Sequence, residues 1–181
     1  MNKIIILTLM MLVAIELSAQ DDSGVIIYGK DWAYIISPPS GWVMNDHILA
    51  DRGIYAFFYE KGKKPSSIDP VIYINTKKLD NDSDEELNIF IDSDIELAKE
   101  KTKTRVEEKT LELKVNGDEK INRVVEYSFM SNSQFETVIY IKYKQYVHML
   151  ILTTRSPFLR DDLLNKLIEV YNSINFMDNT N

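Results

Sequence analysis

The chain has 181 residues, of which 45% are hydrophobic and 27% are charged, a balance typical of a folded domain. Its net charge of -7 argues against nucleic acid as a partner, because phosphate-binding surfaces carry a basic excess. The sequence has no cysteine, which excludes disulfides, thiol catalysis and cysteine-ligated zinc.

Residues 1–19 have the three-part layout of a secretory signal peptide. Lys3 supplies the charged start, an apolar run extends from Ile4 to Ile15, and small residues follow at Ser18 and Ala19. This run is shorter than the roughly 20 residues that a membrane-spanning helix needs. We therefore expect cleavage near Ala19, a secreted or periplasmic location, and no stable membrane insertion after cleavage.

The remaining residues, 20–181, are predicted to form one domain that begins with four strands. Short apolar runs between turn signals predict these strands at residues 24–28, 32–37, 53–60 and 71–76. Pro38, Pro39 and Gly41 predict a turn after the second strand. The third strand alternates apolar side chains on both of its faces, which puts Tyr55 on the opposite face from Ala56.

The stretch "DNDSDEEL", residues 80–87, resembles the start of a calcium-binding loop, with an aspartate at every second position. An EF-hand loop that begins at Asp80 needs glycine at its sixth position and a bidentate glutamate at its twelfth. The chain has Glu85 and Ile91 at these two positions. We therefore expect no metal site here.

The same stretch matches the start of a helix. Ser83 and Glu86 have the spacing of a capping box, and the acidic residues that follow Ser83 suit the positive end of a helix dipole. After them, apolar residues recur at steps of three and four, which predicts a helix. This apolar stripe consists of Leu87, Phe90, Ile91, Ile95 and Ala98.

The rest of the chain predicts a meander followed by a second helix. Strand patterns extend over residues 106–115, 119–130, 135–144 and 146–154, and Asn116-Gly117 is a strong hairpin signal between the first two. Ser156 and Pro157 are suited to open a helix whose apolar face ends at Ile174. The predicted fold class is α+β, with an antiparallel sheet sandwiched by helices in a single domain.

The stretch "WAYIISPPSGW", together with one long helix, a four-strand meander and a closing helix that runs into "NSINF", resembles the PsbP-like fold. The resemblance extends from about Trp32 to Phe176 and is carried by Tyr34, Ile36, Pro38, Pro39, Gly41, Trp42 and the C-terminal helix. This superfamily includes a photosystem accessory protein, a nuclear Ran-binding protein and many secreted bacterial proteins of unassigned role. The resemblance implies a fold, and it transfers no catalytic or binding residue to this chain.

Few residues suggest catalysis. His148 lies in the most apolar strand, where a hydrogen-bonded core or edge position is expected, and His47 lies beside Asp46 in a predicted turn. The chain lacks the G-x-S-x-G elbow of a hydrolase, and Gly62-Lys63 lacks the upstream glycine and the following Ser or Thr of a phosphate loop. We predict no enzyme and no cofactor.

Aromatic residues gather in the N-terminal third of the chain. Trp32, Tyr34, Trp42 and Tyr55 fit either an ordinary core or a binding groove, and no charge or spacing chooses between the two. Our main hypothesis is a non-enzymatic binding or accessory domain that acts through protein–protein contact. The alternative is a carrier of a small apolar ligand, with a pocket near the first strands, and an enzyme of unrecognised type is a third hypothesis.

Overall fold

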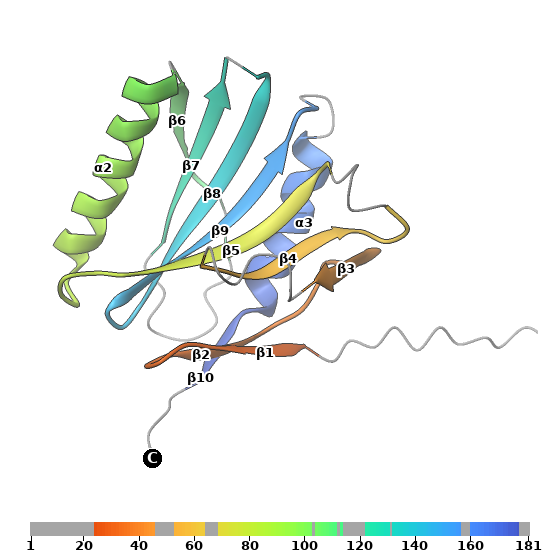
Figure 1. Ribbon diagram of the computed structural model, residues 1–181, viewed down its shortest axis with the longest axis horizontal. Helices are drawn as coiled ribbons and strands as arrows, with labels where there is room; N and C mark the ends of the chain where they lie inside the picture. Colours follow the sequence, from red (N-terminus) through yellow and green to blue (C-terminus); the bar gives the residue numbers. More distant parts are fainter. Residues whose placement is uncertain are drawn as a thin grey trace, which may run out of the picture.

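Seven strands rich in Val, Ile and Tyr form one large sheet in the computed structural model (Figure 1). Their spatial order is β3-β4-β5-β9-β8-β7-β6, and every neighbouring pair is antiparallel. The strands are β3 (Trp42–Asn45), β4 (Ile54–Glu60), β5 (Val71–Lys78), β6 (Arg105–Lys109), β7 (Asn122–Phe129), β8 (Gln134–Tyr143) and β9 (Tyr146–Thr154). The fold is α+β with antiparallel sheets, as the sequence predicts.

The structure describes residues 24–45, 53–63, 69–102, 104–111, 113, 122–130, 132–156 and 160–177. The predicted signal peptide, His47, the Asn116-Gly117 turn and Pro157 lie outside these residues. Neither of the two helices within the described ranges is long and apolar enough to cross a membrane.

A second, three-stranded sheet joins the two ends of the domain. Its strands are β1 (Val25–Tyr28), β2 (Ala33–Ile36) and β10 (Asn175–Met177), and β2 lies in the centre. The sequence did not predict β10, because three residues after a helix are too few to show a strand period. It also did not predict β3, because the breakers from Pro38 to Gly41 concealed the short strand that follows them.

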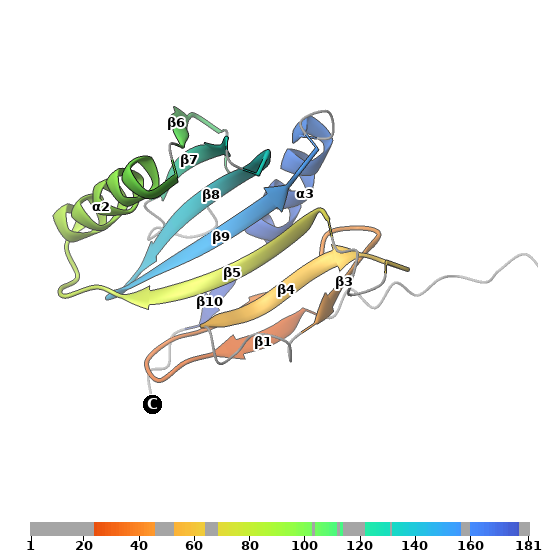
Figure 2. The same cartoon turned by 45° about the horizontal axis from the view of Figure 1, so that its top comes forward.

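The two helices lie on opposite faces of the large sheet (Figures 1 and 2). The first, α2 (Asp84–Thr102), packs Leu87, Ile91 and Ile95 against apolar side chains of β7, β8 and β9. The second, α3 (Arg160–Ser173), packs with both sheets in another apolar cluster. The prediction of a single antiparallel sheet is incomplete, because a second, small sheet adds cover on the α3 side.

Side-chain hydrogen bonds show why α2 begins at Asp84. The Glu86 amide donates to Ser83 Oγ at 3.1 Å, as the capping box predicts. The Ser83 amide instead donates to Asn81 Oδ1 at 2.9 Å, and Asn81 Nδ2 donates to Glu86 Oε2 at 3.3 Å. Asn81 thus connects the two members of the box, so the acidic stretch is the start of a helix.

Two details of the predicted strands are wrong. A β-bulge between Ile54 and Ala56 interrupts β4, and Tyr55 packs against the same core as Ala56 rather than on the opposite face. The predicted strand 106–115 is paired only as far as Lys109 in the described residues, and Leu111 and Leu113 pack against the α3-side core instead. Local alternation could not show where these segments leave the sheet.

Candidate functional site

The aromatic residues of the N-terminal third fill the space between the two sheets. Trp32 and Tyr34 are buried, with their rings stacked at 5.3 Å, and Tyr55 contacts Trp32 edge-on at 5.2 Å. Phe176 of β10 contacts the Tyr34 ring at 5.5 Å. Trp42 and Tyr55 are half-buried against this cluster. These rings pack against one another, which gives them the contacts of a core.

His148 lies in the same layer, as a core residue. Its Nδ1 shares a hydrogen bond of 2.9 Å with Thr76 Oγ1, in agreement with the sequence prediction. Its Nε2 and the Tyr34 hydroxyl are buried, and neither has a hydrogen-bond partner among the described residues. Burial lowers the pKa of His148 to about 3, because the charged imidazolium loses its hydration there.

The acidic stretch before α2 is held to the sheet by a lysine. Lys142 of β8 places its Nζ 2.8 Å from an Asp82 carboxylate oxygen and 3.0 Å from one of Asp84. A lysine ammonium therefore occupies the space between the two carboxylates that a cation would use. No three His, Asp or Glu side chains in the described ranges are grouped so that they could hold a metal ion.

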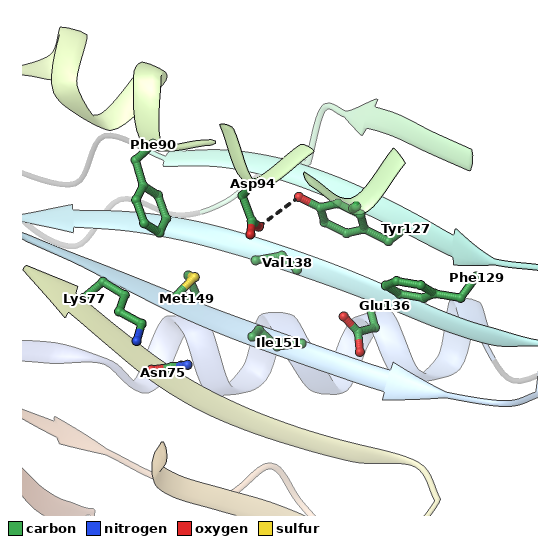
Figure 3. Close-up of a pocket in the computed structure, with 11 residues that line it drawn as sticks. Asn75, Lys77, Phe90, Asp94, Tyr127, Phe129, Glu136, Val138, Met149 and Ile151 are labelled. Carbon is green, nitrogen blue, oxygen red and sulfur yellow. Dashed lines mark hydrogen bonds between the residues drawn. The ribbon is translucent and has the colours of Figure 1, made fainter. Parts of the chain in front are cut away.

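A groove opens between α2 and the large sheet, on the face away from the aromatic core. Its volume is about 390 Å³, within the size range of small-molecule sites. Phe90, Asp94 and Ala98 of α2 form one wall, and residues of β5, β7, β8 and β9 form the rest (Figure 3). The sheet contributes Asn75, Lys77, Tyr127, Phe129, Glu136, Val138, Met149 and Ile151.

Asp94 and Tyr127 of the groove lining form a series of hydrogen bonds with the buried Tyr140. The Tyr140 hydroxyl donates to Asp94 Oδ2 at 2.5 Å. The Tyr127 hydroxyl is 2.6 Å from the Tyr140 hydroxyl and 3.3 Å from Asp94 Oδ2. Because Tyr140 uses its proton toward Asp94, it accepts the shorter bond from Tyr127. Burial raises the pKa of both phenols, so both remain proton donors at neutral pH.

Glu136 is the second carboxylate of the groove. Gln134 Nε2 and Thr153 Oγ1 donate to its Oε1 at 2.7 Å and 3.3 Å. Burial raises its pKa above the ordinary value, and the negative charge of Asp94 raises it further, whereas these two hydrogen bonds act in the opposite direction. Asp94 and Glu136 are therefore close enough to influence each other.

Neither groove carboxylate has a basic partner within the described ranges, where no lysine or arginine nitrogen lies at ion-pairing distance from either. The opposite face of the same sheet differs. There the buried Glu126 is paired with Lys109 at 3.2 Å. The arrangement in the groove can accept a positively charged group without the loss of an existing ion pair.

No sequence motif singled out Asp94 or Glu136 as site residues. One available signal was Glu136 itself, a charged residue that alternates with Val138 and Tyr140 on a strand face that α2 covers. Asp94 lies beside Ile91 and Ile95 on the helix and was hidden among many acidic residues. Their proximity depends on how α2 crosses the sheet, which a strand or helix pattern does not specify.

Comparison with known proteins identifies the fold. No family model and no curated protein matches the chain. Among solved structures, it is similar to the solution structure of the cyanobacterial PsbP (CyanoP) from Synechocystis sp. PCC 6803, with a TM-score of 0.55. The match covers 86% of this chain and 94% of the cyanobacterial chain.

The chain has a PsbP-like fold. The resemblance seen in "WAYIISPPSGW" is confirmed at the level of the fold, since the match extends over most of both proteins. The two sequences are only 14% identical, so the shared PsbP-like fold assigns no function to residues of the groove or of the aromatic core.

Proposed function

We propose that this PsbP-like protein is a non-enzymatic binding domain, and that the α2 groove takes a small molecule. The observation that supports this most strongly is the composition of the groove, in which Val138, Met149 and Ile151 form an apolar floor beside two carboxylates. Ligand sites in proteins combine a mostly apolar lining with a few polar groups that orient the ligand.

This proposal changes the location of the small-ligand site that we expected near the first strands. Trp32 and Tyr34 are buried against each other and against neighbouring rings, so their faces are already in contact. The groove on the other side of the sheet is lined by both apolar and charged side chains and lies open to solvent on one side. The carrier hypothesis is therefore better supported at α2.

A fragment screen with two matched variants tests the proposal. Ala98 lines the groove, so Ala98→Trp should fill part of it, whereas Leu97→Trp places the same ring on the exposed side of the same helix. Neutral, cationic and anionic fragments are screened by thermal shift against all three proteins. We expect shifts that disappear in Ala98→Trp and persist in Leu97→Trp. Shifts that survive Ala98→Trp, or no shift with any fragment, would contradict the proposal.

Protein–protein contact stays as a second candidate function, supported by the outer face of the small sheet. β1 is an edge strand, and its Ile26 and Tyr28 are 55% and 74% exposed. An edge strand with apolar side chains can pair with an extended segment of another protein. Ile26→Lys should abolish capture of such a partner and leave fragment binding in the groove unchanged. Capture that persists in this variant would contradict a contact through β1.

We also propose export with cleavage near Ala19, which the sequence pattern of residues 1–19 supports. Mass spectrometry of the protein purified from its native host should show the loss of about 19 residues. A full-length chain in the cytoplasm would contradict this.

A further inference from the structure

The charged groups of the α2 groove are of both signs and lie in different parts of it. Asp94 and Glu136 contribute two carboxylates, and Lys77 contributes one ammonium group. Figure 3 shows Lys77 near Asn75 toward one end of the groove, Asp94 in the middle, and Glu136 near Phe129 toward the other end. The part of the groove between Asp94 and Phe129 is therefore acidic.

We infer that this acidic part of the groove binds the ammonium group of a small organic cation whose apolar body lies on the groove floor. The inference rests on the proposed function and adds the chemical class of the ligand.

The hydrogen bonds in the groove orient the carboxylates for this role. The described donors of Glu136 all contact Oε1, which leaves Oε2 available to a ligand. Tyr140 donates to Oδ2 of Asp94, and the Tyr127 hydroxyl also lies nearest to Oδ2, which leaves Oδ1 available in the same way. An ammonium group is a donor with no acceptor, so it matches two unused carboxylate oxygens.

The electrostatic coupling of the two carboxylates supports the same conclusion. Burial is the main cause of the raised pKa of Glu136, and the nearby negative charge of Asp94 adds to it. A cation bound between them would stabilise the ionised form of both. The buried Glu126 on the opposite face receives this compensation from Lys109 of the protein itself.

The remaining lining selects an organic cation. The floor of Val138, Met149 and Ile151 offers methyl and methylene contacts to an apolar body. Phe129 and Tyr127 line the groove next to the acidic part, and an aromatic face that is open to the groove attracts an ammonium group. A bare metal ion would gain nothing from this apolar floor, because hard cations need a shell of oxygen ligands.

Three probes of similar size and different charge test the inference: phenethylammonium chloride, 3-phenyl-1-propanol and 3-phenylpropionate. Binding to the full mature chain is measured by isothermal titration calorimetry. We expect phenethylammonium to bind at least about tenfold more tightly than the alcohol, and the carboxylate to bind most weakly.

Variants locate the effect. Glu136→Gln and Asp94→Asn keep the hydrogen-bond acceptors and remove the charge, so each should weaken phenethylammonium binding about tenfold or more. Glu96→Gln removes a charge from the exposed side of the same helix, next to Lys99, and should change binding less than about twofold. Thermal melts confirm that each variant is folded.

The possible outcomes separate this inference from the proposed function. Equal binding of the alcohol and the ammonium, or preference for the carboxylate, would overturn the cation inference and leave the groove as a ligand site. Ammonium binding that Glu96→Gln weakens as much as Glu136→Gln would also overturn it, since long-range charge would explain the affinity. Binding by none of the three probes would overturn the inference, and a failed fragment screen would be needed to overturn the proposed function.

Discussion

The two faces of the large sheet hold polar groups in opposite ways. On the α3 side, Tyr34 and His148 are surrounded by rings, and the Tyr34 hydroxyl and His148 Nε2 have no partner among the described residues. On the α2 side, Tyr127, Tyr140 and Asp94 share a chain of hydrogen bonds that leads into an open groove. Side chains on the α3 side are closed off from solvent, and we call this side of the sheet the dry face. The α2 side opens to solvent at the groove, and we call it the wet face.

This difference assigns the two faces different roles: the aromatic cluster stabilises the fold, and the groove is the proposed binding site. Aromatic residues dominate the dry face. Because they are numerous in the N-terminal third of the sequence, they suggested a binding groove there. Their contacts are with one another, which contributes to folding. The groove on the wet face holds fewer aromatic residues, and its two carboxylates have no lysine or arginine partner among the described residues.

The largest expected effect compares a ring from each face. Trp32→Ala should lower the free energy of unfolding by about 3–5 kcal/mol, because it leaves a cavity among packed rings. Phe90→Ala in the groove wall should cost clearly less, since Phe90 is half-buried and solvent can enter the space. Urea denaturation measures both values. Equal losses would mean that the groove wall is as tightly packed as the core.

The second prediction concerns acid. The pKa of His148 is lowered to about 3 by burial, whereas an unfolded histidine has a pKa of about 6.5. Below pH 6.5, His148 therefore binds a proton in the unfolded chain but stays neutral in the folded protein. The free energy of unfolding falls as the pH drops. The loss between pH 7.5 and pH 5 should be about 2 kcal/mol.

A variant of His148 tests whether this residue causes the loss of stability. Denaturation curves at several pH values should show a flatter pH dependence for His148→Gln than for the wild type. If His148→Gln kept the full pH dependence of the wild type, the burial of His148 would not be the cause of the loss.

The third prediction separates the two phenols of the wet face. Tyr140→Phe removes the hydroxyl that donates to Asp94 and accepts from Tyr127, so it should cost about 1–2 kcal/mol. Tyr127→Phe removes only the first donor of the hydrogen-bonded series and leaves the Tyr140–Asp94 bond. It should therefore lower the free energy of unfolding less than Tyr140→Phe does. Thermal and urea unfolding of both variants provides the comparison. A larger loss of stability in Tyr127→Phe would contradict the hydrogen-bond order Tyr127 to Tyr140 to Asp94.

The smallest expected effect has the opposite sign. The pKa of Glu136 is raised in the folded protein, so stability falls as the pH rises from the pKa of an unfolded glutamate, about 4.3, through the higher folded pKa. Glu136→Gln should therefore stabilise the ligand-free protein by about 0.5–1 kcal/mol at pH 7.5, and the gain should shrink near pH 4. Thermal melts at the two pH values measure this. A loss of stability at pH 7.5 would mean that a charged partner of Glu136 is present in the free protein.

The sequence was sufficient for the parts of the fold that depend on local patterns. Ser83 and Glu86 located the start of α2, and alternation located β8 and β9 within one or two residues. The bulge at Tyr55 and the strand β10 were missed, because both depend on pairing with distant segments. The groove was missed for the same reason, since Asp94 and Glu136 are brought together only when α2 crosses β8.

Methionine and tryptophan side chains allow the central claim, that the α2 groove is the binding site and the aromatic cluster is core, to be tested in one titration. Met149 lines the groove, and Trp32 is buried in the core on the other face. NMR spectra of the methionine methyl groups and the tryptophan indole NH groups are recorded while phenethylammonium is added. We predict a saturable shift of the Met149 methyl signal with the Trp32 indole signal unchanged. A saturable shift of Trp32 without a shift of Met149 would contradict the account and return the binding site to the first strands.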